Sequence, residues 1–251
     1  MRMIAALLTG LLVLSAPPLA AQTIVYQVIT EDVVEVPATG SDRFVEAHPD
    51  TAADSSEVPA NVPKGIASYG PFRVLDATHA ALVDATNEKS PGQFTAMLHA
   101  FPGIRILEMV ECPGTDDDRA NLRLGLMIHQ RGMVTHVPRD GSVRSGAVEL
   151  FLAGARHAAE PGAEFAVHSW VDEFGLEPKD YGADAPENRV YIDYYREMGM
   201  TEAQARAFYA MTNSVPNSQA KWLTTADMAH WIKLDRADAS AQKVDSALAV
   251  N

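Results

Sequence analysis

Hydrophobic and polar positions change in short blocks between residues 69 and 234, and this pattern predicts alternating strands and helices. Ser90, Pro91 and Gln93 form a helix start with serine as the N-cap, and a second helix opens at residues 115–118 and ends at Gly132. Four apolar blocks have the length of strands: residues 72–75, 80–83, 104–110 and 134–137. This β-α-β-α-β order predicts right-handed crossovers and a mostly parallel sheet.

The last third of the domain has a different pattern. Residues 165–168 form an apolar strand, and the chain then turns helical. Thr201 and Gln204 have the spacing of a capping box, which predicts the start of a helix. The remaining expected elements are helices at residues 188–198 and 225–232 and a strand at residues 221–224. We therefore expect an α/β domain at residues 69–234 with a C-terminal helical region.

The two ends of the chain are of another kind. Residues 1–21 read as a signal peptide, with Arg2 before an apolar run and small residues before Gln22. This predicts an exported protein, periplasmic or secreted from a bacterium; a retained N-terminal anchor is the alternative. Residues 22–68 read as an N-terminal extension and linker, with one or two strands within 23–36, and residues 235–251 as a flexible C-terminal tail.

Composition narrows the classes of partner. The formal net charge of −13 over 251 residues argues against binding to nucleic acid or to an anionic membrane surface. After signal cleavage we therefore expect no membrane partner. Cys112 is the single cysteine, so the chain cannot form an internal disulfide.

The candidate chemistry lies in two motifs. Ser145 stands at the start of a small-residue helix, and His168 ends the apolar strand at residues 165–168. A hydroxyl within reach of an imidazole is the minimum for a base-activated nucleophile. Two structural alternatives stay open: Ser145 as the cap of its helix, and His168 as a core histidine bonded to backbone.

The order of these motifs resembles a known family. Cys112-Pro113-Gly114, residues 141–147 (GSVRSGA), residues 165–168 (FAVH) and residues 221–227 are similar to the Clp protease proteolytic subunit and its periplasmic relatives, within the Clp/crotonase fold. The resemblance implies that Ser145 is the nucleophile and His168 its base. It also implies a peptide or protein substrate, a homo-oligomer, and an oxyanion hole of backbone N–H groups from Gly114, Thr115 and Gly146.

Three departures from that family bear on activity. Thr115 replaces a glycine, and Arg144 replaces a small residue, where it would narrow the pocket or bind an acidic substrate group. The orienting aspartate is missing, and Asn217 or Gln219 stands in its region; we expect Asn217 to orient His168. The alternative function is a catalytically degenerate binding or assembly module. An acyl-CoA enzyme of the crotonase branch is a third interpretation, which an exported location disfavours.

The other reactive side chains predict structure rather than chemistry. His129 and His136 form no metal-ligand spacing, and no nucleotide loop or ATPase motif occurs, so we expect no metal, no cofactor and ATP-independent activity. Cys112 is expected to be a buried filler, and residues 116–118 a solvated helix start. The aromatic residues are expected to pack in the core: Tyr191, Tyr194, Tyr195 and Trp222.

Overall fold

The computed structural model describes residues 62–235. The predicted signal peptide, most of the N-terminal extension and nearly all of the C-terminal tail lie outside these residues. Within the described part, no helix combines the length and the apolar character needed to cross a membrane.

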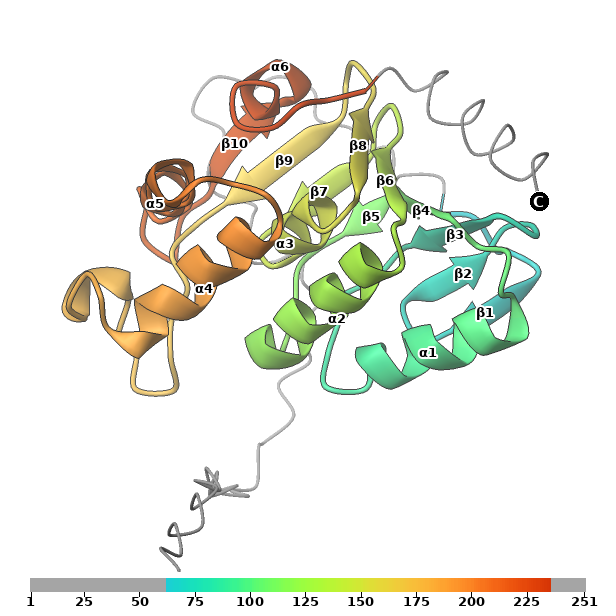
Figure 1. Cartoon of the computed structure of the whole chain (residues 1–251), viewed down its shortest axis with the longest axis horizontal. Helices are drawn as coiled ribbons and strands as arrows, with labels where there is room; N and C mark the ends of the chain where they lie inside the picture. Colours follow the sequence, from blue (N-terminus) through green and yellow to red (C-terminus); the bar gives the residue numbers. More distant parts are fainter. Residues whose placement is uncertain (1–61, 236–251) are drawn as a thin grey trace, which may run out of the picture. The chain divides into compact units, whose positions relative to one another are not determined.

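Ten strands form two sheets in the described part of the chain (Figure 1). The six-stranded sheet has the order β1-β2-β3-β4-β6-β8, and its members are β1 (Ala67–Tyr69), β2 (Phe72–Val74), β3 (His79–Leu82), β4 (Ile106–Met109), β6 (Val134–Val137) and β8 (Arg156–Ala159). The four-stranded sheet has the order β10-β9-β7-β5, and its members are β5 (Glu111–Cys112), β7 (Ser142–Arg144), β9 (Glu164–Val167) and β10 (Lys221–Thr224). The pairings from β3 through β8, and those among β5, β7 and β9, are parallel. The predicted α/β class with a largely parallel sheet is confirmed.

The chain passes from the large sheet to the small one three times. β4 is followed at once by β5, β6 by β7, and β8 by β9. Residue Val110 lies at the first of these bends, where its N–H donates to Leu82 of the large sheet and its carbonyl accepts from Ser142 of the small sheet. The small sheet is therefore a continuation of the large sheet's parallel strands.

Helices α1 (Ser90–Ala100), α2 (Asp118–Gln130) and α3 (Ala147–Leu152) are the crossovers, and α1 packs on α2 and α2 on α3 (Figure 1). The C-terminal region forms the 3₁₀ turn η1 (Pro178–Asp180), then α4 (Pro186–Glu197), α5 (Glu202–Thr212) and α6 (Thr225–Met228). Helices α4 and α5 lie between β9 and β10 in sequence and pack on each other.

Capping explains where several helices begin. Asp117 is the N-cap of α2 and accepts from the N–H of Ala120, while Thr201 and Gln204 form the predicted capping box of α5. The prediction for α1 was wrong by one residue, because Lys89 occupies the N-cap and makes no side-chain cap. The last helix is shorter than predicted, ending at Met228.

Four strands were not predicted as strands: β1, β5, β7 and β8. Residues Arg156–Ala159 of β8 are alanine-rich and suit a helix by propensity, yet they pair in parallel with β6. The others have only two or three residues, too few for a period to appear. Tertiary pairing decides the conformation of all four.

The hydrophobic core lies between the sheets and the crossover helices. Its largest fully buried members include Phe72, Phe94, Leu107, Phe151 and Phe165. Phe151 of α3 packs on Phe165 of β9 with ring centroids 5.0 Å apart. This contact fixes α3, and the turn before it, against the small sheet.

Candidate active site

The predicted site residues gather at one edge of the small sheet. Gly114 follows β5, Ser145 follows β7 and His168 follows β9, and these three strands are parallel. The carboxyl ends of parallel strands meet at one edge of a sheet, which is where open α/β folds place ligands. Asn217 precedes β10, which is antiparallel to β9, so it comes to the same edge.

Ser145 has an unusual backbone conformation. Its φ of +50° lies in the left-handed region, which non-glycine residues rarely enter. Its N–H donates to Ala166 of β9 at 2.8 Å, and its carbonyl accepts from Val148 of α3 at 2.9 Å. The residue is therefore held in a sharp turn between strand and helix, and strain of this kind is concentrated at functional sites.

The helix-cap alternative for Ser145 is not what the structure shows. Gly146 is the N-cap of α3, and the helix has no side-chain cap. Among residues 62–235 the Ser145 hydroxyl makes no hydrogen bond, so the bond to His168 is not formed in this structure. Catalytic hydrogen bonds are often long in the absence of substrate and tighten when it binds.

Gly114 approaches the Ser145 side chain closely. In the described part of the chain, the N–H groups of Gly114, Thr115 and Gly146 donate no hydrogen bond. A Cβ on Gly114 would lie 3.0 Å from the Ser145 Cβ and 3.4 Å from its Oγ, and the φ of Gly114 is +134°. Only glycine fits this close approach in this conformation.

Thr115 and Asn121 fix the turn on the other side of Ser145. The Thr115 methyl group would lie 2.6 Å from a Cβ on Gly146, so Thr115 occupies the space beside this glycine. The Asn121 amide donates to the Gly146 carbonyl at 2.6 Å and its Oδ1 accepts from Thr86 at 2.9 Å. The departure at Thr115 therefore packs against the turn instead of disrupting it.

His168 is held through its Nδ1 atom. Nδ1 lies 2.9 Å from the Ser169 carbonyl and 3.1 Å from the Asn217 Nδ2. The Asn217 Nδ2 also donates to the Ser169 carbonyl, at 2.9 Å. The carbonyl can only accept, so the amide atom facing it and the imidazole is the nitrogen.

This arrangement corrects the expected role of Asn217. The side chain lies beside His168 as predicted, but it presents a donor and does not accept from the imidazole. The acceptor available to an Nδ1–H is the Ser169 carbonyl, and that tautomer places the lone pair on Nε2. Gln219, the other candidate, is exposed.

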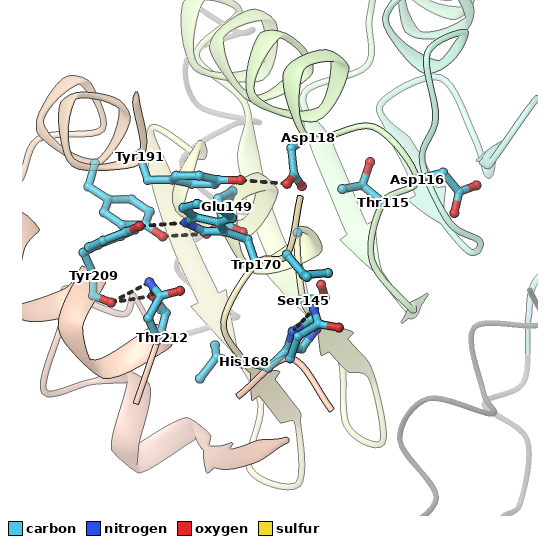
Figure 2. A pocket seen from close by; sticks show the side chains of 16 residues that line it. Thr115, Asp116, Asp118, Ser145, Glu149, His168, Trp170, Tyr191, Tyr209 and Thr212 are labelled. Atoms are coloured by element: carbon cyan, nitrogen blue, oxygen red, sulfur yellow. Dashed lines mark hydrogen bonds between the residues drawn. The ribbon is translucent and has the colours of Figure 1, made fainter. Parts of the chain in front are cut away.

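Ser145 and His168 line the same cavity, which has a volume of about 300 Å³ (Figure 2). Its walls also carry the carboxylates of Asp116, Asp118 and Glu149, and no lysine or arginine of the described residues lines it. Three carboxyl groups and the His168 imidazole therefore line this pocket. Its other lining side chains include Val167, Trp170, Val171, Tyr191, Tyr195, Tyr209 and Thr212.

Glu149 is a functional candidate that sequence reasoning missed. It is buried, and Tyr195 donates to its Oε1 at 2.6 Å while Tyr194 donates to its carbonyl at 2.7 Å. Burial raises the pKa of Glu149 to about 7. A lone carboxylate in the apolar run of α3, four residues after Ser145, was the available signal.

Asp118 was predicted to be part of a solvated helix start. It is exposed in the first turn of α2, as expected, and it also accepts a hydrogen bond from Tyr191 at 2.7 Å at the margin of the pocket, as Figure 2 shows. The sequence did not indicate this partner, because Tyr191 comes from α4, 73 residues later. Asp117 behaves as expected, since it caps α2.

The aromatic residues divide between core and pocket. Tyr194 and Tyr195 are buried in the core, as predicted, and Tyr195 and the partly buried Tyr191 also line the cavity. Trp170 stacks on Tyr191 with ring centroids 6.2 Å apart and donates to the Tyr209 hydroxyl at 2.7 Å. These rings form one wall of the pocket.

Two further expectations concern residues outside the cavity. Arg144 does not line it; its side chain bonds Glu111 of β5 and Ser142, which removes it as a candidate for binding an acidic substrate group. Cys112 is fully buried and its thiol lies 3.4 Å from the Leu82 carbonyl. Burial raises the pKa of that thiol, as fits a core filler.

Comparison with known proteins gives matches among solved structures. No family profile matches the sequence, and no curated protein matches it. A ClpP1 mutant from Listeria monocytogenes is 14% identical with a TM-score of 0.45, and the match covers 64% of this chain and 91% of that chain. An enoyl-CoA hydratase from Shewanella pealeana is 17% identical with a TM-score of 0.47, covering 73% of this chain and 75% of that chain.

A membrane protease specific for a stomatin homolog from Pyrococcus horikoshii is also similar. It is 11% identical with a TM-score of 0.41, and the match covers 63% of this chain and 71% of that chain. The matches thus include proteases and hydratases of the Clp/crotonase superfamily that the sequence resembles. The likeness is one of fold.

Proposed function

We propose that this chain is an exported serine peptidase-like hydrolase that cleaves peptide or ester bonds without ATP. The observation that carries the proposal is the meeting of Ser145 and His168 in one cavity, with Ser145 in a left-handed conformation before α3. The bonds to β9 and α3 require a sharp turn here, and glycine would adopt this conformation with less strain than serine. A nucleophile does benefit, because a sharp turn exposes its hydroxyl to the pocket.

The proposed reaction follows from the groups around Ser145. The Ser145 Oγ attacks the substrate carbonyl while His168 Nε2 takes its proton, and the imidazolium then protonates the leaving group. The N–H groups of Gly114, Thr115 and Gly146 stabilise the oxyanion. Water then attacks the acyl-enzyme, and His168 acts as base a second time.

Among the described residues, His168 Nδ1 faces the Ser169 carbonyl and the Asn217 amide rather than a carboxylate. The Ser169 carbonyl accepts the Nδ1–H, which orients the ring but brings no full charge to stabilise an imidazolium. Loss of such a carboxylate lowers turnover by about 10⁴ in a serine protease. We therefore expect turnover to be slow, so that covalent labelling of Ser145 is easier to detect than cleavage of a substrate.

The test is labelling with a fluorophosphonate probe between about pH 6 and pH 9, where a histidine base is neutral. We expect the full chain to be labelled and Ser145→Ala to be unlabelled. Ser142→Ala is the matched control, because Ser142 lies three residues away on β7 and outside the lining of the cavity. An unlabelled wild-type chain across this range would leave the binding or assembly module as the better interpretation.

A further inference from the structure

Glu177 contacts Asn217, the residue that occupies the region of the expected aspartate beside His168. Its Oε1 accepts from the Asn217 backbone N–H at 2.9 Å, and the Asn217 side chain in turn contacts His168 Nδ1 and the Ser169 carbonyl. The Glu177 side chain is only 13% exposed, although it lies in the loop that leads to η1. One residue thus separates a carboxylate from the imidazole.

We propose that Glu177 is a positioning residue that holds Asn217 against His168 and supplies the negative charge which the missing aspartate would provide. This inference rests on the proposed function. Charge acts through space, so a carboxylate one residue removed still favours the imidazolium, with less effect than a direct partner.

The surrounding charges agree with this role. The Asn217 N–H, the ion pair with Lys179 and the charge of His168 all hold the pKa of Glu177 below its usual value, so the carboxylate is ionised at neutral pH. Among the described residues, the charge of Asp118 in α2 also interacts with that of His168. Lys179 opposes Glu177, since its Nζ lies 2.9 Å from Oε2, but its side chain is 71% exposed and solvent weakens its effect.

Two variants that should shift the pKa of His168 in opposite directions test the proposal. Glu177→Gln removes the charge and keeps an oxygen that accepts from the Asn217 N–H, and Lys179→Ala removes the opposing charge and leaves Glu177 in place. The pKa of His168 is measured by NMR titration of its ring proton, assigned with His168→Gln. We expect this pKa to fall by about 0.5 in Glu177→Gln and to rise by a smaller amount in Lys179→Ala.

The rate of fluorophosphonate labelling gives the second readout. In Glu177→Gln the midpoint of the rate against pH should fall together with the pKa of His168, and the plateau rate should fall about three-fold. A loop that serves only as support would not shift the two variants in opposite directions. A pKa of His168 that is unchanged in both variants overturns the proposal.

The test of Glu177 can be distinguished from the test of the proposed function. The NMR titration reports on Glu177 even if Ser145 proves unreactive. If Glu177→Gln does not fold, Lys179→Ala decides, because its site is exposed: a rise in the pKa of His168 supports the proposal and no rise overturns it.

Discussion

Three segments of the chain each contribute a strand to both sheets, yet the two sheets have different roles. The large sheet buries its strands in the core, with Leu107 and Ala80 fully buried. The parallel strands of the small sheet, β5, β7 and β9, have two to four residues and end one or two residues before Gly114, Ser145 and His168. The first sheet provides stability, and the second positions chemistry at the ends of strands that the first has already aligned.

Matched substitutions in the two sheets give the sharpest test of this division, with the largest expected effect. Leu107→Ala in β4 should lower the free energy of unfolding by about 2–5 kcal/mol, because it opens a cavity in the core. Labelling of the folded fraction should change less than about two-fold, since the strand ends stay in place. Urea unfolding and labelling rates measure the two effects.

Leu223→Ala in β10 is the counterpart. Leu223 is 7% exposed and pairs with Phe165 of β9, so its loss disturbs the strand that brings Asn217 to His168. We expect a smaller loss of stability but labelling slower by about ten-fold, because small displacements of catalytic groups are costly. Equal effects of both variants on labelling would contradict the proposed difference in role between the two sheets.

Glu149→Gln tests how the stability of the protein depends on pH. The folded protein holds a proton on Glu149 up to about pH 7, whereas the unfolded chain releases it near the ordinary value of 4.5. Between these values the folded state binds more protons, so stability falls as pH rises. The wild type should lose about 3 kcal/mol from pH 4 to pH 8 relative to Glu149→Gln, whose amide oxygen still accepts from Tyr195.

Urea unfolding at the two pH values checks this expectation, with Glu164→Gln as the control because Glu164 is exposed. Parallel pH dependence of the wild type and Glu149→Gln would show that Glu149 ionises normally in the folded state.

Ser145→Gly addresses the smallest effect, the strain at the end of β7. Relief of the left-handed conformation is offset in part by the entropy of glycine, so we expect a gain of about 0.5 kcal/mol with labelling abolished. Ser145→Ala keeps the conformation and should gain nothing. If thermal unfolding shows the glycine variant to be no more stable than the alanine variant, Ser145 carries no strain.

The sequence predicted the large sheet better than the small one. Strands such as residues 134–137 and the capping box at Thr201 have local signals of sufficient length, and the structure has β6 and α5 at these places. The small sheet has few such local signals, because β5 and β7 are too short to show an alternation of apolar and polar residues. Motif order predicted Ser145 as a site residue although β7, the strand before it, was not predicted.

What could not be predicted depends on contacts between distant residues. The left-handed conformation of Ser145 depends on its bond to Ala166 of β9, 21 residues later, and the partner of Asp118 comes from α4. The orientation of the Asn217 amide is set by the Ser169 carbonyl, 48 residues away. Local propensity carries no information about such pairs.

The antiparallel pairing of β9 with β10 has a consequence for how this protein can diversify. Helices α4 and α5 form one excursion between these strands, and the pairing fixes where the excursion leaves and returns. Tyr191, Tyr195 and Tyr209 belong to that excursion and shape the cavity, whereas Ser145 and His168 are anchored in the sheet. Substitutions within this one contiguous stretch of the chain can therefore change the shape of the cavity while the proposed Ser145–His168 pair stays in place.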